Sequence, residues 1–77
     1  MSYAQFDTVV LARDLPEHGL CAGDLGAVVE VYSSDGIEVE FVTASGRTKA
    51  LVTLSSKDVR SIADSDLVAV RSLERSA

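Results

Sequence analysis

A small all-β domain of five to six antiparallel strands is the fold class that this sequence predicts. Short runs rich in β-branched residues recur along the chain, one of them alternates strictly in polarity, and glycine-containing turns separate them. With 77 residues, 47% of them hydrophobic, the chain can bury one small core. We therefore expect a single domain over residues 1–77, with its core at about 6–71 and frayed ends.

The stretch 23–32 organises the rest of the chain, because a glycine-rich turn leads directly into a β-branched run. Gly26 is the expected pivot, since a residue without Cβ allows a positive φ or a close approach of another chain segment. In the strand expected at 26–32, Glu30 must face water. Strict alternation then directs Ala27, Val29 and Val31 inward, and Val28 and Tyr32 outward.

The remaining strands follow from the same pattern. They are expected at residues 7–13, 37–42, 47–54, 59–62 and 67–71, the last closing the sheet against the first. The cleanest alternation turns Ile37, Val39 and Phe41 inward. Turns are expected at 33–36, at Ser45-Gly46 and at 63–66.

Two further segments complete the predicted architecture. The long loop 14–22 carries Leu15 and Leu20, which we expect to cover one mouth of the domain. Ser55 and Asp58 have the spacing of a capping box, which favours one turn of 3₁₀ helix at 55–58. A long first loop and a short helical turn before the last strand are typical of an SH3-like barrel.

The strand register that brings the inward-facing residues together also determines which residues lie side by side on the outer face of the sheet. This outer face is a candidate binding surface. The expected hairpins place Tyr32 opposite Glu38 and Glu30 opposite Glu40, with apolar side chains beside them. An apolar patch with a rim of carboxylates suits a basic protein partner. The predicted partner-binding residues are Val28, Glu30, Tyr32, Glu38, Glu40, Val42 and Leu51.

The distribution of charge along the chain also favours a basic protein partner. The net charge is −5, and it divides into −7 over residues 1–46 and +2 over residues 47–77. An acidic half disfavours a nucleic-acid partner, because phosphate binding needs clustered Lys and Arg.

Catalytic and metal chemistry are not indicated. His18 and Cys21 are only two of the four ligands that a structural zinc site needs. Ser55, Ser56 and Asp58 supply residue types of a catalytic triad, but no nucleophile-elbow glycines flank either serine. We expect no enzyme activity, no cofactor and no metal.

Cys21 is the one cysteine, so no disulfide can form within the chain. No basic-then-apolar leader opens the sequence, and no apolar run approaches the ~20 residues of a membrane span. We expect a cytoplasmic protein without a membrane partner.

Four motifs carry a resemblance to a known family. They are DTVVL at 7–11, DLPEHGL at 14–20, GDLGAVVEVY at 23–32 and VEFV at 39–42. Together they resemble, over about residues 6–71, a family of small bacterial proteins catalogued as a domain of unknown function. The resemblance implies an SH3-like barrel, and an enzyme or toxin partner encoded nearby. Ala27 and Cys21 depart from that pattern, which usually has Thr and a charged residue there.

Two function classes remain. The first is a non-enzymatic protein-binding module, such as an antitoxin, an immunity-type neutraliser or an accessory subunit. The alternative is a nucleic-acid-binding barrel of the KOW or Tudor type, whose opening resembles residues 23–31. The charge and the scarcity of stacking aromatics favour the first class, and a homo-oligomer is compatible with it.

Overall fold

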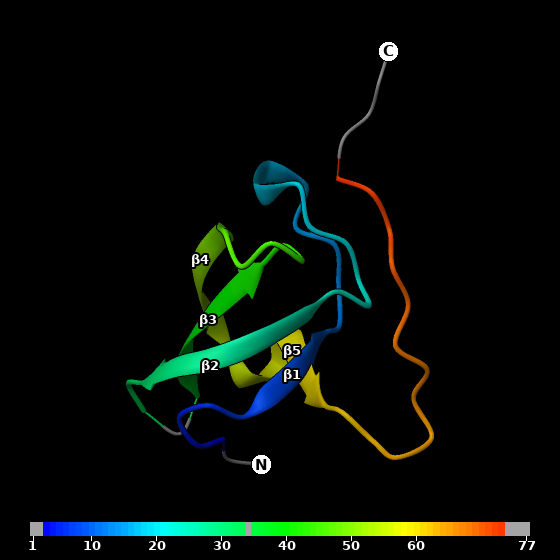
Figure 1. The fold of residues 1–77 in the computed structure, drawn as a ribbon. Helices are drawn as coiled ribbons and strands as arrows, with labels where there is room; N and C mark the ends of the chain where they lie inside the picture. The colour runs from blue at the N-terminus through cyan, green and yellow to red at the C-terminus, as the bar shows by residue number, and fades with distance from the viewer. Residues whose placement is uncertain (1–2, 34, 74–77) are drawn as a thin grey trace.

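Five antiparallel strands form one sheet in the order β4-β3-β2-β1-β5 (Figure 1). The structure is a computed structural model, and it describes residues 3–33 and 35–73. The strands are β1 (Thr8–Leu11), β2 (Leu25–Val31), β3 (Gly36–Val42), β4 (Thr48–Ser55) and β5 (Val59–Ser61).

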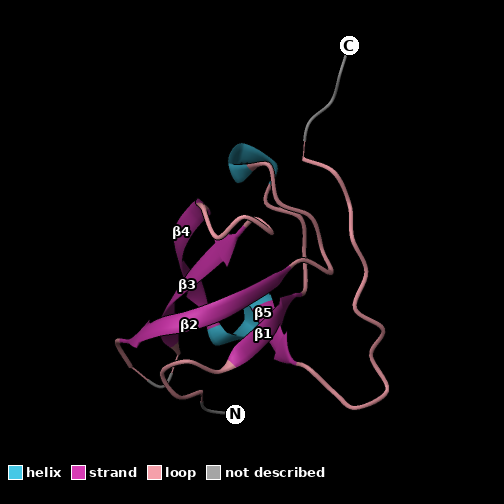
Figure 2. Cartoon of the chain, in the orientation of Figure 1, coloured by secondary structure: helices cyan, strands magenta, loops and turns pink. Residues whose placement is uncertain are grey.

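The helical elements of the described residues are two 3₁₀ turns, η1 (Pro16–His18) and η2 (Ser56–Asp58) (Figure 2). The predicted all-β class and the 3₁₀ turn at 55–58 are therefore confirmed, whereas η1 was not predicted. The SH3-like barrel remains a prediction. Residue 34 of the expected 33–36 turn and the terminal residues 1–2 and 74–77 lie outside the described residues.

The core is aliphatic apart from one aromatic ring. Ile37, Val39 and Phe41 are all buried, as the alternation of β3 predicts. Leu15 and Leu20 are also buried and join each other in an isolated bridge, so the long loop covers the core as expected. The cluster comprises Val9, Leu11, Leu15, Leu20, Val28, Ile37, Val39, Phe41, Val52, Leu54 and Val59.

The hairpin between β3 and β4 has the predicted register over most of its length. Phe41 pairs with Ala50 and Val39 with Val52. The turn itself is longer than the expected two residues, because the Gly46 N–H donates to Thr43 O at 2.9 Å and the Thr43 N–H donates to Arg47 O. Gly46 has a φ of 89°, the left-handed conformation that ends the three-residue loop 44–46. The register shifts at this point, so Val42 pairs with Thr48 and not with Lys49.

The predicted faces are wrong for β2 before the bulge. Val28 is fully buried and pairs with Val39, and Ala27 pairs with the outward Glu40, which reverses the prediction. Val31 pairs with the buried Ile37 and so lies on the predicted inward side, although it is 38% exposed. A register shift between Val28 and Glu30 marks a β-bulge, which adds one residue to the strand. Strict alternation fails there, so Val28 faces the core while Glu30 still faces water. Glu30 consequently pairs with Glu38, not with Glu40.

The expected sixth strand at 67–71 is also wrong. Val9 and Val10 of β1 pair with β2 along one edge and with β5 along the other, so no edge of β1 is left for another strand. The chain after residue 66 is extended but is not part of the sheet, and it passes along the side of the molecule (orange to red in Figure 1).

η2 is held by the predicted capping box. The Ser55 side chain accepts a hydrogen bond from Lys57 N, and the Asp58 carboxylate accepts one from Ser55 N at 3.0 Å. Arg13, which follows β1, donates to the other oxygen of Asp58 at 2.8 Å. The hydrogen bond from Arg13 is the main reason why the pKa of the Asp58 carboxyl is lowered.

The lowered pKa of Asp58 predicts a loss of stability in acid. The carboxylate stabilises the fold fully above its unfolded-state pKa of about 3.9, and this contribution is lost as the pH falls through the lower folded-state pKa. We expect Asp58→Asn to lower the melting temperature at pH 7, and the difference from wild type to shrink below about pH 4. Thermal melts from pH 7 to pH 2 measure this. Asp64→Asn, the same charge change at an exposed position, is the control; an equal, pH-independent effect of both variants would contradict the prediction.

Candidate functional site

The predicted surface exists on the outer side of the sheet, although not with every predicted residue. Alternation in β3 directs Glu38 and Glu40 away from the buried Val39. Glu38 pairs with Glu30 on one side and with Thr53 on the other, whereas Glu40 lies between Ala27 and Leu51. We call this the carboxylate face, and it comprises Glu30, Tyr32, Glu38, Glu40, Val42, Leu51 and Thr53.

Hydroxyl groups fix two of the carboxylates. Tyr32 Oη donates to Glu38 Oε1 at 2.9 Å, and Thr53 Oγ1 donates to the same oxygen at 2.8 Å. Thr48 Oγ1 donates to Glu40 Oε2. The hydrogen bond to the Glu38 carboxylate raises the pKa of the Tyr32 phenol. The face therefore presents acceptor oxygens in defined positions rather than on freely rotating side chains.

Apolar side chains lie next to these carboxylates. Leu51, directly across from Glu40 on β4, is 55% exposed, and Val42 at the end of β3 is equally exposed. Tyr32 is 59% exposed and so offers its ring as well as its hydroxyl. The structure thus brings six of the seven predicted residues to the surface, and it removes Val28, which is part of the core.

Sequence reasoning missed the role of the threonines. Thr48 and Thr53 lie on β4. The Thr48 hydroxyl donates to the Glu40 carboxylate, and the Thr53 hydroxyl donates to the Glu38 carboxylate. For Thr53 a signal was available, because it lies opposite Glu38 in the expected register and a β-branched hydroxyl suits a cross-strand hydrogen bond. Thr48 pairs with Val42 and reaches Glu40 diagonally, which the sequence pattern did not indicate.

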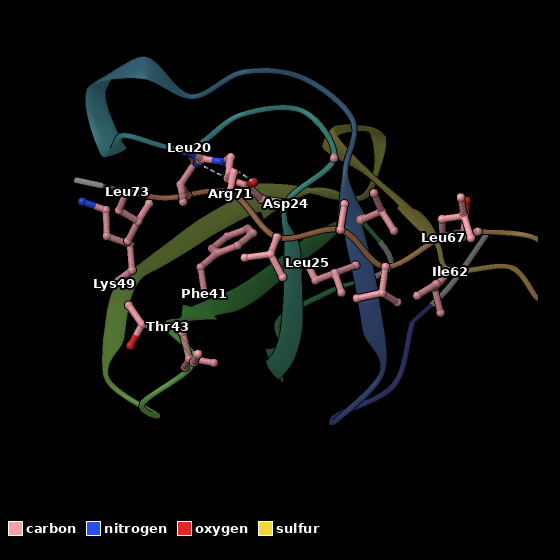
Figure 3. Close-up of a pocket in the computed structure, with 18 of the residues that line it drawn as sticks. Leu20, Asp24, Leu25, Phe41, Thr43, Lys49, Ile62, Leu67, Arg71 and Leu73 are labelled. Atoms are coloured by element: carbon pink, nitrogen blue, oxygen red, sulfur yellow. Dashed lines mark hydrogen bonds and ion pairs between the residues drawn. The ribbon is translucent and has the colours of Figure 1, made fainter. Parts of the chain in front are cut away.

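A second feature was not predicted at all. Residues 66–73, which we call the arm, cross the side of the molecule above a cleft of about 870 Å³ (Figure 3). The cleft is lined by core and surface side chains that include Leu20, Leu25, Phe41 and Ile62. Val10, whose strand neighbours Val9 and Leu11 point into the core, is buried here instead.

Ion pairs hold both ends of the arm. Arg60 binds Asp66 with two hydrogen bonds of 2.9 and 3.0 Å, which lower the pKa of the Asp66 carboxyl to about 2. Arg71 donates to both oxygens of Asp24 at 2.8 and 2.6 Å and to Gly19 O. Between these anchors, Leu67, Val68 and Val70 are 95%, 70% and 96% exposed.

Within residues 3–33 and 35–73, no group of three or more His, Cys, Asp or Glu side chains is arranged to hold a metal ion. The same residues contain no helix of sufficient length and hydrophobicity to cross a membrane.

Comparison with known protein families identifies the domain. The model of the family described as Domain of unknown function (DUF4926) matches residues 5–61, which is most of the chain. The chain belongs to the DUF4926 family. No curated protein and no solved structure matches it.

The DUF4926 match begins before β1 and ends at the last residue of β5. All five strands and the carboxylate face therefore lie within the family domain. The arm lies beyond the matched residues, although the resemblance in the sequence suggested a family pattern as far as residue 71.

Proposed function

We propose that this DUF4926 protein is a non-enzymatic binding module whose carboxylate face docks a basic protein. The observation that carries the proposal is the pairing of exposed Leu51 with Glu40, beside a Glu38 carboxylate fixed by two hydroxyl donors. An apolar centre supplies binding energy once water is excluded, and carboxylates at the rim attract a cationic partner.

Charge on the same face supports a cationic partner. Glu30 and Glu38 pair directly across β2 and β3, a like-charge arrangement that costs stability when the strands stand alone. A lysine or arginine between them would relieve this repulsion. Such a partner fits an enzyme or toxin that the module neutralises or an assembly that it supports, which are the roles of an antitoxin, an immunity protein or an accessory subunit.

The proposal predicts separate effects on association and dissociation. Glu40→Lys should slow association about tenfold or more at low salt, because steering by opposite charges is lost. Leu51→Asp should instead speed dissociation about tenfold or more, because it places an unpaired charge in the centre of the contact. Both side chains are on the outer face, so the fold should be retained, and circular dichroism checks this.

The experiment begins with immobilised wild-type protein and an extract of the native cells. Proteins that wild type and the control Glu17→Lys retain, but that Glu40→Lys and Leu51→Asp lose, are identified by mass spectrometry. Glu17→Lys makes the same charge change on η1, away from the face. Association and dissociation rates of the purified partner are then measured at two salt concentrations.

Equal retention by all four proteins would overturn the proposal. A gel-shift titration with a single-stranded RNA of mixed sequence tests the nucleic-acid alternative. RNA binding that survives Glu40→Lys and Leu51→Asp would favour that class instead.

A further inference from the structure

The middle of the arm is apolar and extended, and it is not part of the sheet. Residues 67–70 read Leu-Val-Ala-Val, a run of high β-propensity. The structure describes no hydrogen bond from their backbone N–H and C=O groups to any described residue. Exposed, unpaired strand backbone of this kind is a template for a strand from another chain.

The ion pairs at the two ends of the arm restrict its movement before it pairs with another strand. Arg60 holds Asp66, and Asp24 holds Arg71, so both ends of the extended segment between them are anchored to the domain. Ordering a strand before association reduces the entropy that association must overcome.

The charged residues of one arm are complementary to those of a second copy of the arm. When two copies of the segment pair antiparallel about their midpoint, Val68 is opposite Ala69 of the second copy, Leu67 is opposite Val70, and Asp66 is opposite Arg71. A shift of one residue in either direction places Asp66 opposite Val70 or Ser72, and the charge match is lost. This register is therefore favoured by opposite-charge pairs at both ends.

Both charged groups have bonding capacity left for a second copy. In the described contacts Arg71 uses Nε and Nη2 but not Nη1. The Asp66 carboxylate accepts three hydrogen bonds, from Arg60 Nη1 and Nη2 and from Ala63 N, out of about four that it can accept. The intermolecular pairs can thus form without breaking the intramolecular ones.

We propose that the arm is a homodimerisation strand, which pairs antiparallel with the arm of a second copy in the register Asp66–Arg71. The arrangement is a two-fold symmetric contact, in which each copy offers the same surface. The cleft beneath the arm shares Val42 with the carboxylate face, but the paired residues of the arm are not part of that face. The proposal does not depend on the function proposed for the carboxylate face. A ribbon this short falls below the usual size of a stable interface, so the dimer should be half-formed only at about 0.1–1 mM protein.

The proposal is tested with variants in which the charge of Asp66 or Arg71 is reversed. Sedimentation velocity over a concentration series measures the fraction of dimer in each. Asp66→Arg alone puts arginine opposite arginine, and Arg71→Asp alone puts aspartate opposite aspartate, so each variant should remain monomeric. In an equimolar mixture, opposite charges face each other again at both ends of the ribbon. Each copy still lacks one of its own ion pairs, Arg60–Asp66 or Asp24–Arg71, so the mixture should dimerise more weakly than wild type but more strongly than either variant alone. Asp64→Arg, the same charge change two residues before Asp66, should dimerise like wild type.

Far-ultraviolet circular dichroism and thermal melts establish that the variants are folded. Wild type that stays monomeric at about 3 mM overturns the proposal, as do single variants that dimerise like wild type or a mixture that does not associate. Monomeric wild type whose arm variants lose the partner of the carboxylate face would instead assign the arm to that partner.

Discussion

Phe41→Ala is expected to remove between about a third and nearly all of the free energy of unfolding of the domain. Phe41 is 2% exposed, pairs with Ala50 on β4, and is the only aromatic ring in the described core cluster. Truncating a buried phenylalanine costs about 3–5 kcal/mol, which includes the cavity that remains. A chain of this length has a total stability of only about 5–10 kcal/mol.

Urea denaturation followed by circular dichroism measures the effect of this change. Phe6→Ala is the matched control, because the Phe6 ring is 76% exposed and its removal should cost less than about 0.5 kcal/mol. Equal urea midpoints for the two variants would show that the inward face of β3 has been misassigned.

Gly26→Val should cost about 3 kcal/mol, through overpacking rather than through backbone strain. A Cβ at position 26 would lie 2.5 Å from Val39 Cγ1 and 2.9 Å from Phe41 Cε2, far inside contact distance. Gly26 is not among the residues with positive φ. Of the two reasons expected for a glycine here, the close approach of a neighbouring strand is therefore the one that applies.

A double-mutant cycle tests this cause directly. Val39→Ala removes the nearest obstructing methyl groups, so Gly26→Ala should cost less in a Val39→Ala background than in wild type. Ala27→Val is the control on the other face of β2, with an expected cost within about 0.5 kcal/mol. Additive effects of Gly26→Ala and Val39→Ala would mean that the two side chains do not compete for the same space.

The strands that sequence reasoning placed correctly are those in which local pattern and tertiary structure agree. In β3, two glutamates separate three large apolar residues, so only one face can be buried. The short hairpin between β3 and β4 then determines which residues of β4 pair with β3. Ser55 and Asp58 could be recognised as a capping box because the motif depends on neighbouring residues alone.

The errors arise where the answer depends on distant parts of the chain. In β2, Val28, Val29 and Val31 are all apolar, so composition does not show which of them is displaced by a bulge. Placing Val28 on the candidate surface followed from that ambiguity. Residues 67–71 have a strand-like composition, but whether they join a sheet depends on a free edge, and β5 already occupies that edge of β1.

The positions of the candidate-site residues were predicted correctly on β3 and β4, where alternation decides which side chains face outward. Glu38, Glu40 and Leu51 were placed on one face correctly, because they alternate with buried residues on β3 and β4. The opposition of Glu30 to Glu38 required the register of the β2–β3 hairpin, which the bulge shifts. The arm was not recognised as a surface, since the same apolar run was assigned to a sixth strand of the sheet.

The pairing of β1 with β5 has a consequence for cooperativity. The other three strand pairs join neighbours in the chain, but Val9 pairs with Ser61 across most of the domain. Closing a loop of about 50 residues costs roughly 3–4 kcal/mol of chain entropy on the length-dependent term alone. One three-residue strand cannot repay this cost unless Val59 also completes the core around Val9 and Leu11. The first strand and the last are therefore expected to gain or lose their structure together, which makes the two ends of the family domain a single unit of unfolding.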